Sequence, residues 1–356
     1  MSRTKKWALV CVVLIAVGVG LILAGSLMGA RILSIGVNNN GLYVKTAESY
    51  PGSAQNNQVK EDITLDSFSS IESNIDFADL TIIPSDHFGL SYSLNEYFQL
   101  TYEVKDGCLY LNQKNSSEGL NLFNFSLGAN FPYTTADTIT IYLPEDSGLT
   151  LVSGNMGSAD LSISDINVDS LDLHLSFGNI RFENMEIDSG DIHMDSGNAD
   201  FSHITFNSLN LENNFGNITF TDLSVSGKTE IFLDSGTLKL EEVHFSDLHF
   251  TGSFNTMEGS KITADNLDLS LDSGNVMLRE LLAESMSIES SFGNVDLELV
   301  QPLDYYNYDV TTEFGSITIG GKKLGMEYYS LFGDESSGHW INITCSSCDV
   351  TIKSDS

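Results

Sequence analysis

Seven short strings recur in the stretch 176–294: SFGN (176–179), DSGN (195–198), NFGN (214–217), DSGT (234–237), SFNT (253–256), DSGN (272–275) and SFGN (291–294). Their third positions hold glycine, with Asn255 as the exception, and they lie 19 residues apart except for one interval of 20 between Gly216 and Gly236. An internal repeat of this length is typical of solenoid architectures, so this stretch decides the fold.

Apolar residues within the repeat follow one template. Counted from each third position as zero, they fall at offsets 2, 4, 7, 9, 12 and 14, as three apolar-x-apolar pairs. Such a pair is the period-2 pattern of a strand that buries one face, and stacked coils of three short strands would bury a continuous core. The sequence therefore predicts an all-β, single-stranded β-solenoid, a right-handed β-helix with coils of about 19 residues. The alternative is a turn of two repeats.

The residue before the third position alternates in size along the repeat. Phe177, Phe215, Phe254 and Phe292 alternate with Ser196, Ser235 and Ser273. Large and small residues in alternation can fill a packed column, so we expect these side chains to pack at native density.

Asp195, Asp234 and Asp272 precede the serines. The Gly-Gly-x-Gly-x-Asp nonapeptide of calcium-binding β-rolls is absent from the sequence. We therefore interpret these residues as turn aspartates favoured by local hydrogen bonds, and we predict neither a metal nor a cofactor.

Residues 7–30 contain no charge and are long enough to cross a bilayer as a helix. Arg3, Lys5 and Lys6 precede them, so the positive-inside bias places the N-terminus in the cytoplasm. We predict a single-pass cell-membrane protein whose C-terminal domain lies outside the cytoplasm and whose residues 7–30 contact the lipid bilayer. A cleaved signal peptide is the alternative, but its apolar core is normally shorter.

Composition shifts divide the chain into four predicted parts. Residues 1–6 form a cytoplasmic tail, 7–30 the transmembrane anchor, 31–60 a polar spacer and 61–356 the extracytoplasmic solenoid domain. For part of the spacer the alternative is a first strand, since residues 35–44 are not strongly polar. Within that domain we expect an irregular N-terminal β part (61–145), regular coils (146–300) and C-terminal capping coils (301–356), because the end of a solenoid core must be covered.

Two further groups of residues are candidate sites. The aromatic residues of one Ser- and Asn-rich segment form either an exposed interaction surface or a loop that covers the core; they are Phe123, Phe125, Phe131 and Tyr133. Cys345 and Cys348 form a C-x-x-C motif without the βαβ context of a redox pair and without a second pair of zinc ligands. Because Cys348 aligns with a turn glycine, we favour a structural role for the pair, as free thiols or as a local disulfide.

The acidic balance limits the choice of partners. With 49 Asp and Glu against 16 Lys and Arg, the net charge is -33. Phosphate backbones are bound by clustered basic residues, so nucleic acid is excluded as a partner.

The order of features resembles the bacterial putative-adhesin family, a domain of unknown function. The resemblance rests on the N-terminal anchor, FADLTIIP (77–84), TITIYLP (138–144), the Ser-Gly-Asn and Phe-Gly-Asn turns and DVTI (349–352). It implies an extracytoplasmic β-solenoid associated with the cell envelope, with adhesion or stress-response roles and without catalytic residues to carry over.

We therefore expect a membrane-anchored, surface-exposed module that presents a binding or scaffolding surface to a cell-envelope glycan or another envelope protein. The alternative is a carbohydrate-active β-helix enzyme, a polysaccharide lyase or hydrolase. Asp188, Asp191, His193 and Asp195 crowd one region, and paired carboxylates are what glycosidic cleavage needs. All three aspartates lie in turn-type strings, so we predict a protein that is not an enzyme.

Overall fold

The structure is a computed structural model that describes residues 58–95, 98–115, 137–332 and 338–354, together with the backbone of 32–38, 41–46 and 120–124. The chain divides into two compact units, of which the larger comprises Lys60–Tyr92, Leu100–Lys114 and Thr138–Ser356. The predicted tail (1–6) and anchor (7–30) lie outside the described residues. Within the described ranges, no helix is long and apolar enough to span a bilayer.

The smaller unit contains a three-stranded sheet. Strand β1 (Ile32–Asn38) pairs antiparallel with β2 (Gly41–Thr46) on one side and with β9 (Leu120–Asn124) on the other. Strands β1 and β2 fall within the range predicted as a spacer, and β9 falls within the aromatic segment.

Among the described residues, 18 strands pair in one continuous sheet, most of it in the larger unit. In chain order they are β3 (Gln58–Thr64), β4 (Ser70–Ile75), β5 (Asp79–Ser85), β6 (Gly89–Leu94), β7 (Phe98–Lys105), β8 (Cys108–Asn115), β10 (Thr138–Pro144), β11 (Leu149–Ser158), β12 (Leu161–Ser164), β13 (Val168–Phe177), β14 (Ile180–Ser196), β15 (Ala199–Phe215), β16 (Ile218–Leu299), β17 (Asn307–Thr312), β18 (Ile317–Ile319), β19 (Lys322–Leu324), β20 (Glu327–Ser330) and β21 (Trp340–Ser354). A 3-10 helix, η2 (Leu303–Tyr305), precedes β17.

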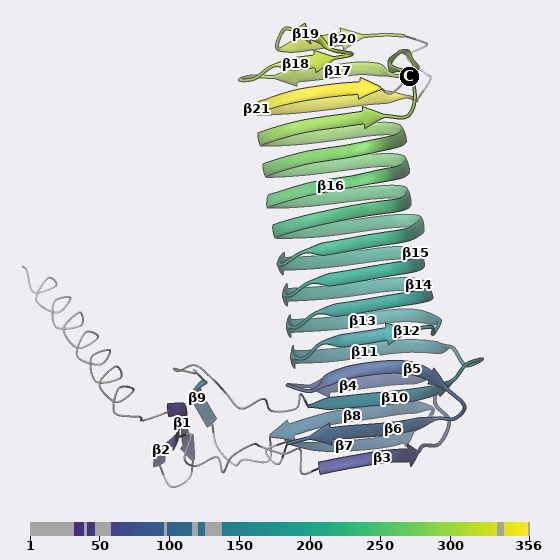
Figure 1. Ribbon diagram of the computed structural model, residues 1–356, viewed down its shortest axis with the longest axis vertical. Coiled ribbons are helices and arrows are strands. Elements are labelled where there is room, and N and C mark those ends of the chain that lie inside the picture. Colours follow the sequence, from purple (N-terminus) through teal and green to yellow (C-terminus); the bar gives the residue numbers. More distant parts are fainter. Residues whose placement is uncertain are drawn as a thin grey trace, which may run out of the picture. The chain divides into compact units, whose positions relative to one another are not determined.

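Register fixes the length of one turn. Ile180 pairs in parallel with Ala199, and Ala199 pairs with Ile218, so each residue faces the residue 19 positions later. The prediction of 19-residue coils is confirmed and the turn of two repeats is excluded. Figure 1 shows the resulting column, in which β16 winds through successive coils above β13, β14 and β15. The hand of the coil stays a prediction.

The one interval of 20 residues has a local cause. The register between β15 and β16 shifts after Phe206, so that Leu209 faces Thr229 instead of Lys228. The extra residue sits at a corner that contains Gly227, where a Cβ atom would lie 2.5 Å from the carbonyl oxygen of Asn207. The corner absorbs the insertion, and the inward-facing positions on either side keep their places.

The predicted core positions are confirmed. In the four coils that begin at positions 197, 236, 255 and 274, every residue at offsets 2, 4, 7, 9, 12 and 14 is buried except Gly259, which is partly buried. The structure adds one inward column, three positions before each corner glycine, which the template did not include. Leu175, Met194, Asn213, Leu233, Leu271, Ser290 and Cys345 occupy it.

Both ends of the column depart from chain order. Strand β4 pairs in parallel with β8 and with β11, and β5 pairs with β10 and with β12, so early strands are covered by later ones. At the other end, β21 lies between the last coil of β16 and strands β17 and β18, as Figure 1 shows. The C-terminal strand is thus paired on both sides instead of forming an edge.

Tyrosines close the core beyond β16. Tyr306 and Tyr308 are fully buried, and the Tyr306 hydroxyl donates to the carbonyl oxygen of Ala283 at 2.9 Å. Burial raises the pKa of Tyr306 to about 12 and raises the pKa of Tyr308 as well. The predicted capping segment 301–356 therefore contributes large aromatic side chains to the end of the core.

Candidate functional site

The corner at the glycine positions brings successive coils close together. Gly197, Gly216, Gly236, Gly274 and Gly293 have φ between 137° and 159°. A Cβ atom at these five positions would lie 1.5–1.8 Å from the carbonyl oxygen of the residue one coil earlier. Only glycine fits such an approach, since any side chain would collide with the backbone. The chain turns sharply here, between the inward residues at offsets -3 and 2, and the side chain before the glycine projects outward.

Phenylalanines at this corner form an exposed line, which we call the Phe edge. Phe177, Phe215, Phe254 and Phe292 are 57–66% exposed. The register extends the line at both ends. Ser158 pairs with Phe177, and Met156, two residues before Ser158, pairs with Ile75, two residues before Phe77. At the other end, Phe314 donates its backbone N–H to the carbonyl oxygen of Ser346. The complete Phe edge is Phe77, Phe177, Phe215, Phe254, Phe292 and Phe314.

Serine occupies the same position in every intervening coil. Ser196 pairs with Phe215, Phe215 with Ser235, and Phe292 with Ser347. We call Ser158, Ser196, Ser235, Ser273 and Ser347 the serine notches. Coils stack about 4.8 Å apart, so neighbouring rings are separated by about 10 Å with a notch between them.

The expectation that these phenylalanines pack in a dense column is wrong. Their position is outside the core template, and the sharp corner turns the side chains into solvent instead of against the neighbouring coil. The phenylalanines that do stack inside the column are different residues: Phe201 lies between Phe182 and Phe220 at ring-centroid distances of 5.0 and 5.4 Å.

A ladder of polar side chains runs beside the Phe edge, at the residue after each corner position. The Asn198 backbone N–H donates to Oδ1 of Asn179 at 3.0 Å, and Asn217 donates to Asn198 in the same way. The ladder begins at Asp79 and Asp160 and recurs at Asn275 and Asn294. On the other side of the edge, Asp195 and Asp234 lie at serine-notch coils. The rings are therefore bordered by hydrogen-bonding groups.

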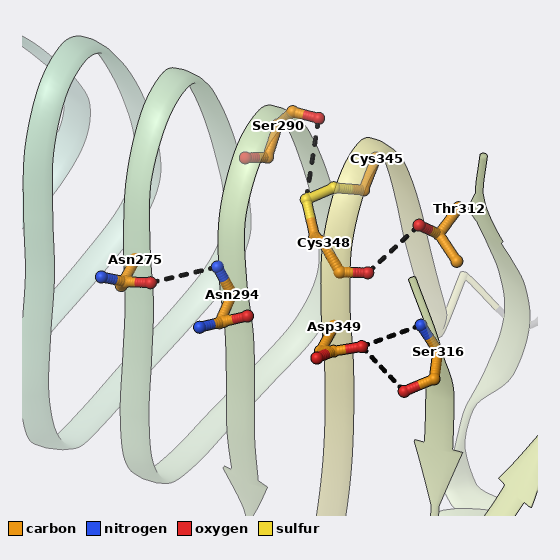
Figure 2. The surroundings of a disulfide bond; sticks show 8 residues. All are labelled: Asn275, Ser290, Asn294, Thr312, Ser316, Cys345, Cys348 and Asp349. Atoms are coloured by element: carbon orange, nitrogen blue, oxygen red, sulfur yellow. Dashed lines mark hydrogen bonds between the residues drawn. A yellow bond between two sulfur atoms is a disulfide. The ribbon is translucent and has the colours of Figure 1, made fainter. Parts of the chain in front are cut away.

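Cys345 and Cys348 are brought together as a disulfide across this corner (Figure 2). Cys345 pairs with Ser290 in the inward column, and Cys348 pairs with Gly293 in the glycine column. The alignment of Cys348 with a turn glycine is thus the alignment in the structure. Thr312 of the next coil donates to the Cys348 carbonyl oxygen, and Ser316 donates to Asp349, which continues the polar ladder.

The residues weighed for glycosidic cleavage lie on the outside of β14 and take part in coil-to-coil contacts. Asp191 accepts from the Asn210 amide at 2.8 Å, and Asp188 accepts from the Asn207 amide at 2.8 Å. His193 lies between Asp191, at 3.2 Å, and Glu212, at 3.0 Å. Asp195 sits at the corner, two residues beyond His193. The contacts of Asp191 and Asp188 are with ladder partners one coil away, the same pattern that Asn ladders show elsewhere.

The aromatic candidates of the Ser- and Asn-rich segment lie outside the part of the chain whose side chains the structure describes. Phe123 belongs to β9, where only the backbone is described, and Phe125, Phe131 and Tyr133 lie outside the described residues. In the described part of the chain, no group of three or more His, Cys, Asp or Glu side chains could hold a metal ion.

Comparison with known proteins finds one matching family and several similar solved structures. The Toastrack DUF4097 family matches residues 68–353, which confirms the resemblance inferred from the motifs. Solved structures similar to the chain include a putative cell adhesion protein from Clostridium sporogenes (14% identity, 84% of this chain and 100% of that chain, TM-score 0.25) and a putative adhesin from Bacteroides fragilis (14%, 84% and 97%, 0.29). A putative lipid binding protein from Parabacteroides distasonis is 15% identical over 85% and 98%, with a TM-score of 0.29. No curated protein sequence matches the chain.

A sequence signal for the Phe edge existed. Phe177, Phe215, Phe254 and Phe292 lie one position before the corner, which is not among the apolar offsets that define the core. A large apolar residue at a position that the core template leaves out is a candidate for exposure.

Proposed function

The chain belongs to the Toastrack DUF4097 family, and from this premise we propose that it is a membrane-anchored extracytoplasmic module that presents the Phe edge as a binding surface. Its role is adhesin-like or associated with envelope stress, and it binds or scaffolds a component of the cell envelope. The proposal includes the anchor at residues 7–30, with the N-terminus in the cytoplasm, and a binding role instead of catalysis.

One observation carries this proposal: the fold does not require phenylalanine at the Phe edge. Serine occupies the equivalent position in each intervening coil, and the backbone pairs in the same register there. Exposed apolar side chains gathered on one face of a protein are a mark of interaction sites. We therefore attribute the phenylalanines of the Phe edge to binding of a partner, since the column keeps its register with serine at the same position.

The proposed topology rests on the charges that flank residues 7–30. It is tested by protease treatment of intact cells that produce the full chain. We expect the solenoid to be reached from outside while a tag at the N-terminus stays protected. A solenoid that is digested only after the cells are broken would overturn the topology.

The proposed binding role is tested with a photo-reactive amino acid placed at Phe215 or Phe254 of the full chain. Illumination of intact cells is expected to link the chain to an envelope component. The matched control places the same probe at Glu284, which is exposed in the regular coils about half a coil away from the corner of the Phe edge. Equal labelling from both places, or none from the Phe edge, would contradict the proposal.

A further inference from the structure

We propose that the Phe edge binds an uncharged 1,4-β-linked glycan that lies along the column, with one ring for each disaccharide. This inference rests on the proposed function and names the class of partner. It follows from three properties of the edge: its period, the chemistry of its borders and its charge.

The period of the edge matches such a polymer. One coil advances by about 4.8 Å, so one ring follows the next after about 10 Å. A hexopyranose in an extended 1,4-linked chain spans close to one coil between its linking oxygens. Successive sugars of a 1,4-β-linked chain are flipped, so every second sugar presents the same face. A ring on every second coil would therefore meet the same sugar face each time.

The chemistry of the edge suits the two kinds of surface on a sugar. The C–H face of a pyranose packs against an aromatic ring, and Phe177, Phe215, Phe254 and Phe292 offer exposed rings in line. The hydroxyls of the intervening sugar face a serine notch. There Ser196 and Ser235 present hydroxyl groups, and Asp195 and Asp234 present carboxylates that accept hydrogen bonds.

Charge decides against polyanionic occupants and against a second copy. The chain has a net charge of -33, and Asp195, Asp234 and Asp272 stand in the line of serine notches. A polyanionic glycan or an anionic membrane would be repelled. A second copy could insert its rings into the notches, since the edge is self-complementary, but it would bring its own aspartates against these. An uncharged polymer meets neither penalty.

Calorimetry with the full chain and fully N-acetylated chito-oligosaccharides, which are uncharged, tests the inference with oligomers of increasing length. Several rings on one straight edge act together, so affinity is expected to increase with each added disaccharide. Phe215→Ser combined with Phe254→Ser should lower the affinity at least about tenfold, as the loss of two stacking contacts implies. These substitutions introduce the residue that neighbouring coils already carry, so the fold is expected to persist.

A second variant separates a matched period from general apolar adhesion. Ser196→Phe combined with Ser235→Phe fills two notches and adds apolar surface. Rings on consecutive coils are compatible with the fold, since they already stack at Phe182, Phe201 and Phe220. If sugars insert into the notches, this variant should bind chito-oligosaccharides more weakly than the native chain. Stronger binding would overturn the inference.

The outcomes for the inference and for the proposed function are distinct. If the native chain does not bind the oligosaccharides but still cross-links to the envelope through Phe215 and Phe254, the inference fails and the proposed function stands. If the Phe→Ser variant dissociates a dimer in sedimentation experiments, the occupant is a second copy and the inference also fails. If neither binding nor cross-linking occurs, both fail.

Discussion

Corner glycines are the residues on which the stacking of the coils depends most directly. At Gly216 the added Cβ of any other residue would lie 1.7 Å from the carbonyl oxygen of Gly197. Asn255 is the exception in the series, and its buried side chain donates from Nδ2 to the carbonyl oxygen of Leu233. It reaches the space beside Gly252, where a Cβ would lie 2.2 Å from its Oδ1. Glycine at 252 thus makes room for asparagine at 255.

Gly216→Ala is expected to destabilise the protein by about 2–4 kcal/mol, because the substitution combines an unfavourable φ of 148° with a backbone collision. Urea unfolding followed by circular dichroism measures the change. Gly325→Ala is the control, since nothing lies within 4 Å of its added Cβ. Equal stability of the two variants would show that the corner tolerates a side chain.

The disulfide at Cys345 and Cys348 constrains a very short segment, so its effect on the unfolded chain is worth about 2 kcal/mol. The structure suggests its replacement: Cys345→Leu combined with Cys348→Gly restores the residues that Leu271 and Gly274 hold in an earlier coil. We expect the double variant to lie within about 1 kcal/mol of the native protein, because packing offsets the lost cross-link. Cys348→Ala alone loses the cross-link without a gain in packing, so it should be less stable than the native protein by about 2 kcal/mol, which the same unfolding measurement will test.

At the level of elements, the last coils are stabilised by a strand that arrives out of order. Strand β21 pairs with β16 on one side and with β17 and β18 on the other. All three partners precede β21 in sequence, so the pairing of these strands is complete only once β21 has been made. The tyrosines near η2 cover the core beside it, and Tyr306 reaches back to Ala283 in β16.

Alkaline pH should weaken this end of the column. The pKa of Tyr306 is raised to about 12 by burial, against about 10 in an unfolded chain. Between these values the unfolded chain loses the phenolic proton while the folded chain keeps it. Because the unfolded state then binds fewer protons, stability falls as pH rises above about 10.

The check is the midpoint of thermal unfolding from neutral to alkaline pH, compared with Tyr306→Phe. The variant loses the hydrogen bond to Ala283 and should be less stable by about 1–2 kcal/mol at neutral pH. Its decline above pH 10 should be shallower than that of the native protein. Parallel declines would mean that Tyr306 does not govern this dependence.

At the scale of the whole molecule, charge works against folding. The excess of acidic residues gives a net charge of -33, and like charges repel more in the compact state than in the unfolded chain. Exposed ion pairs such as Lys261 with Glu242 contribute little, since such pairs are screened by solvent. Salt screens both the ion pairs and the like-charge repulsion. The stability lost with the ion pairs should therefore be smaller than the stability gained as the repulsion weakens.

Added sodium chloride is expected to raise the urea midpoint of the full chain, with most of the gain at low ionic strength, where screening changes fastest. Replacing sodium chloride by an equal osmolarity of sucrose controls for effects that do not depend on charge. A midpoint that falls with salt would show that the surface ion pairs outweigh the repulsion.

Much of the solenoid could be predicted because its information is local. The repeat predicted coils of about 19 residues, although only the register excluded a turn of two repeats. Alternation within each coil identified inward residues such as Phe201, Leu211 and Leu240, since a strand side chain alternates between faces whatever its neighbours are. The Cys348 alignment with the glycine column followed from the same spacing.

The Phe edge and the order of the end strands were decided by the tertiary structure. Phe215 and Phe201 are the same residue type, but a corner turns one into solvent while a strand face buries the other. Strand β21 could not be placed between β16 and β17 from sequence order, because that pairing joins segments distant along the chain. Local periodicity determines which residues a coil buries. Only the packing of coils decides which side chains remain outside, and therefore where a partner can bind.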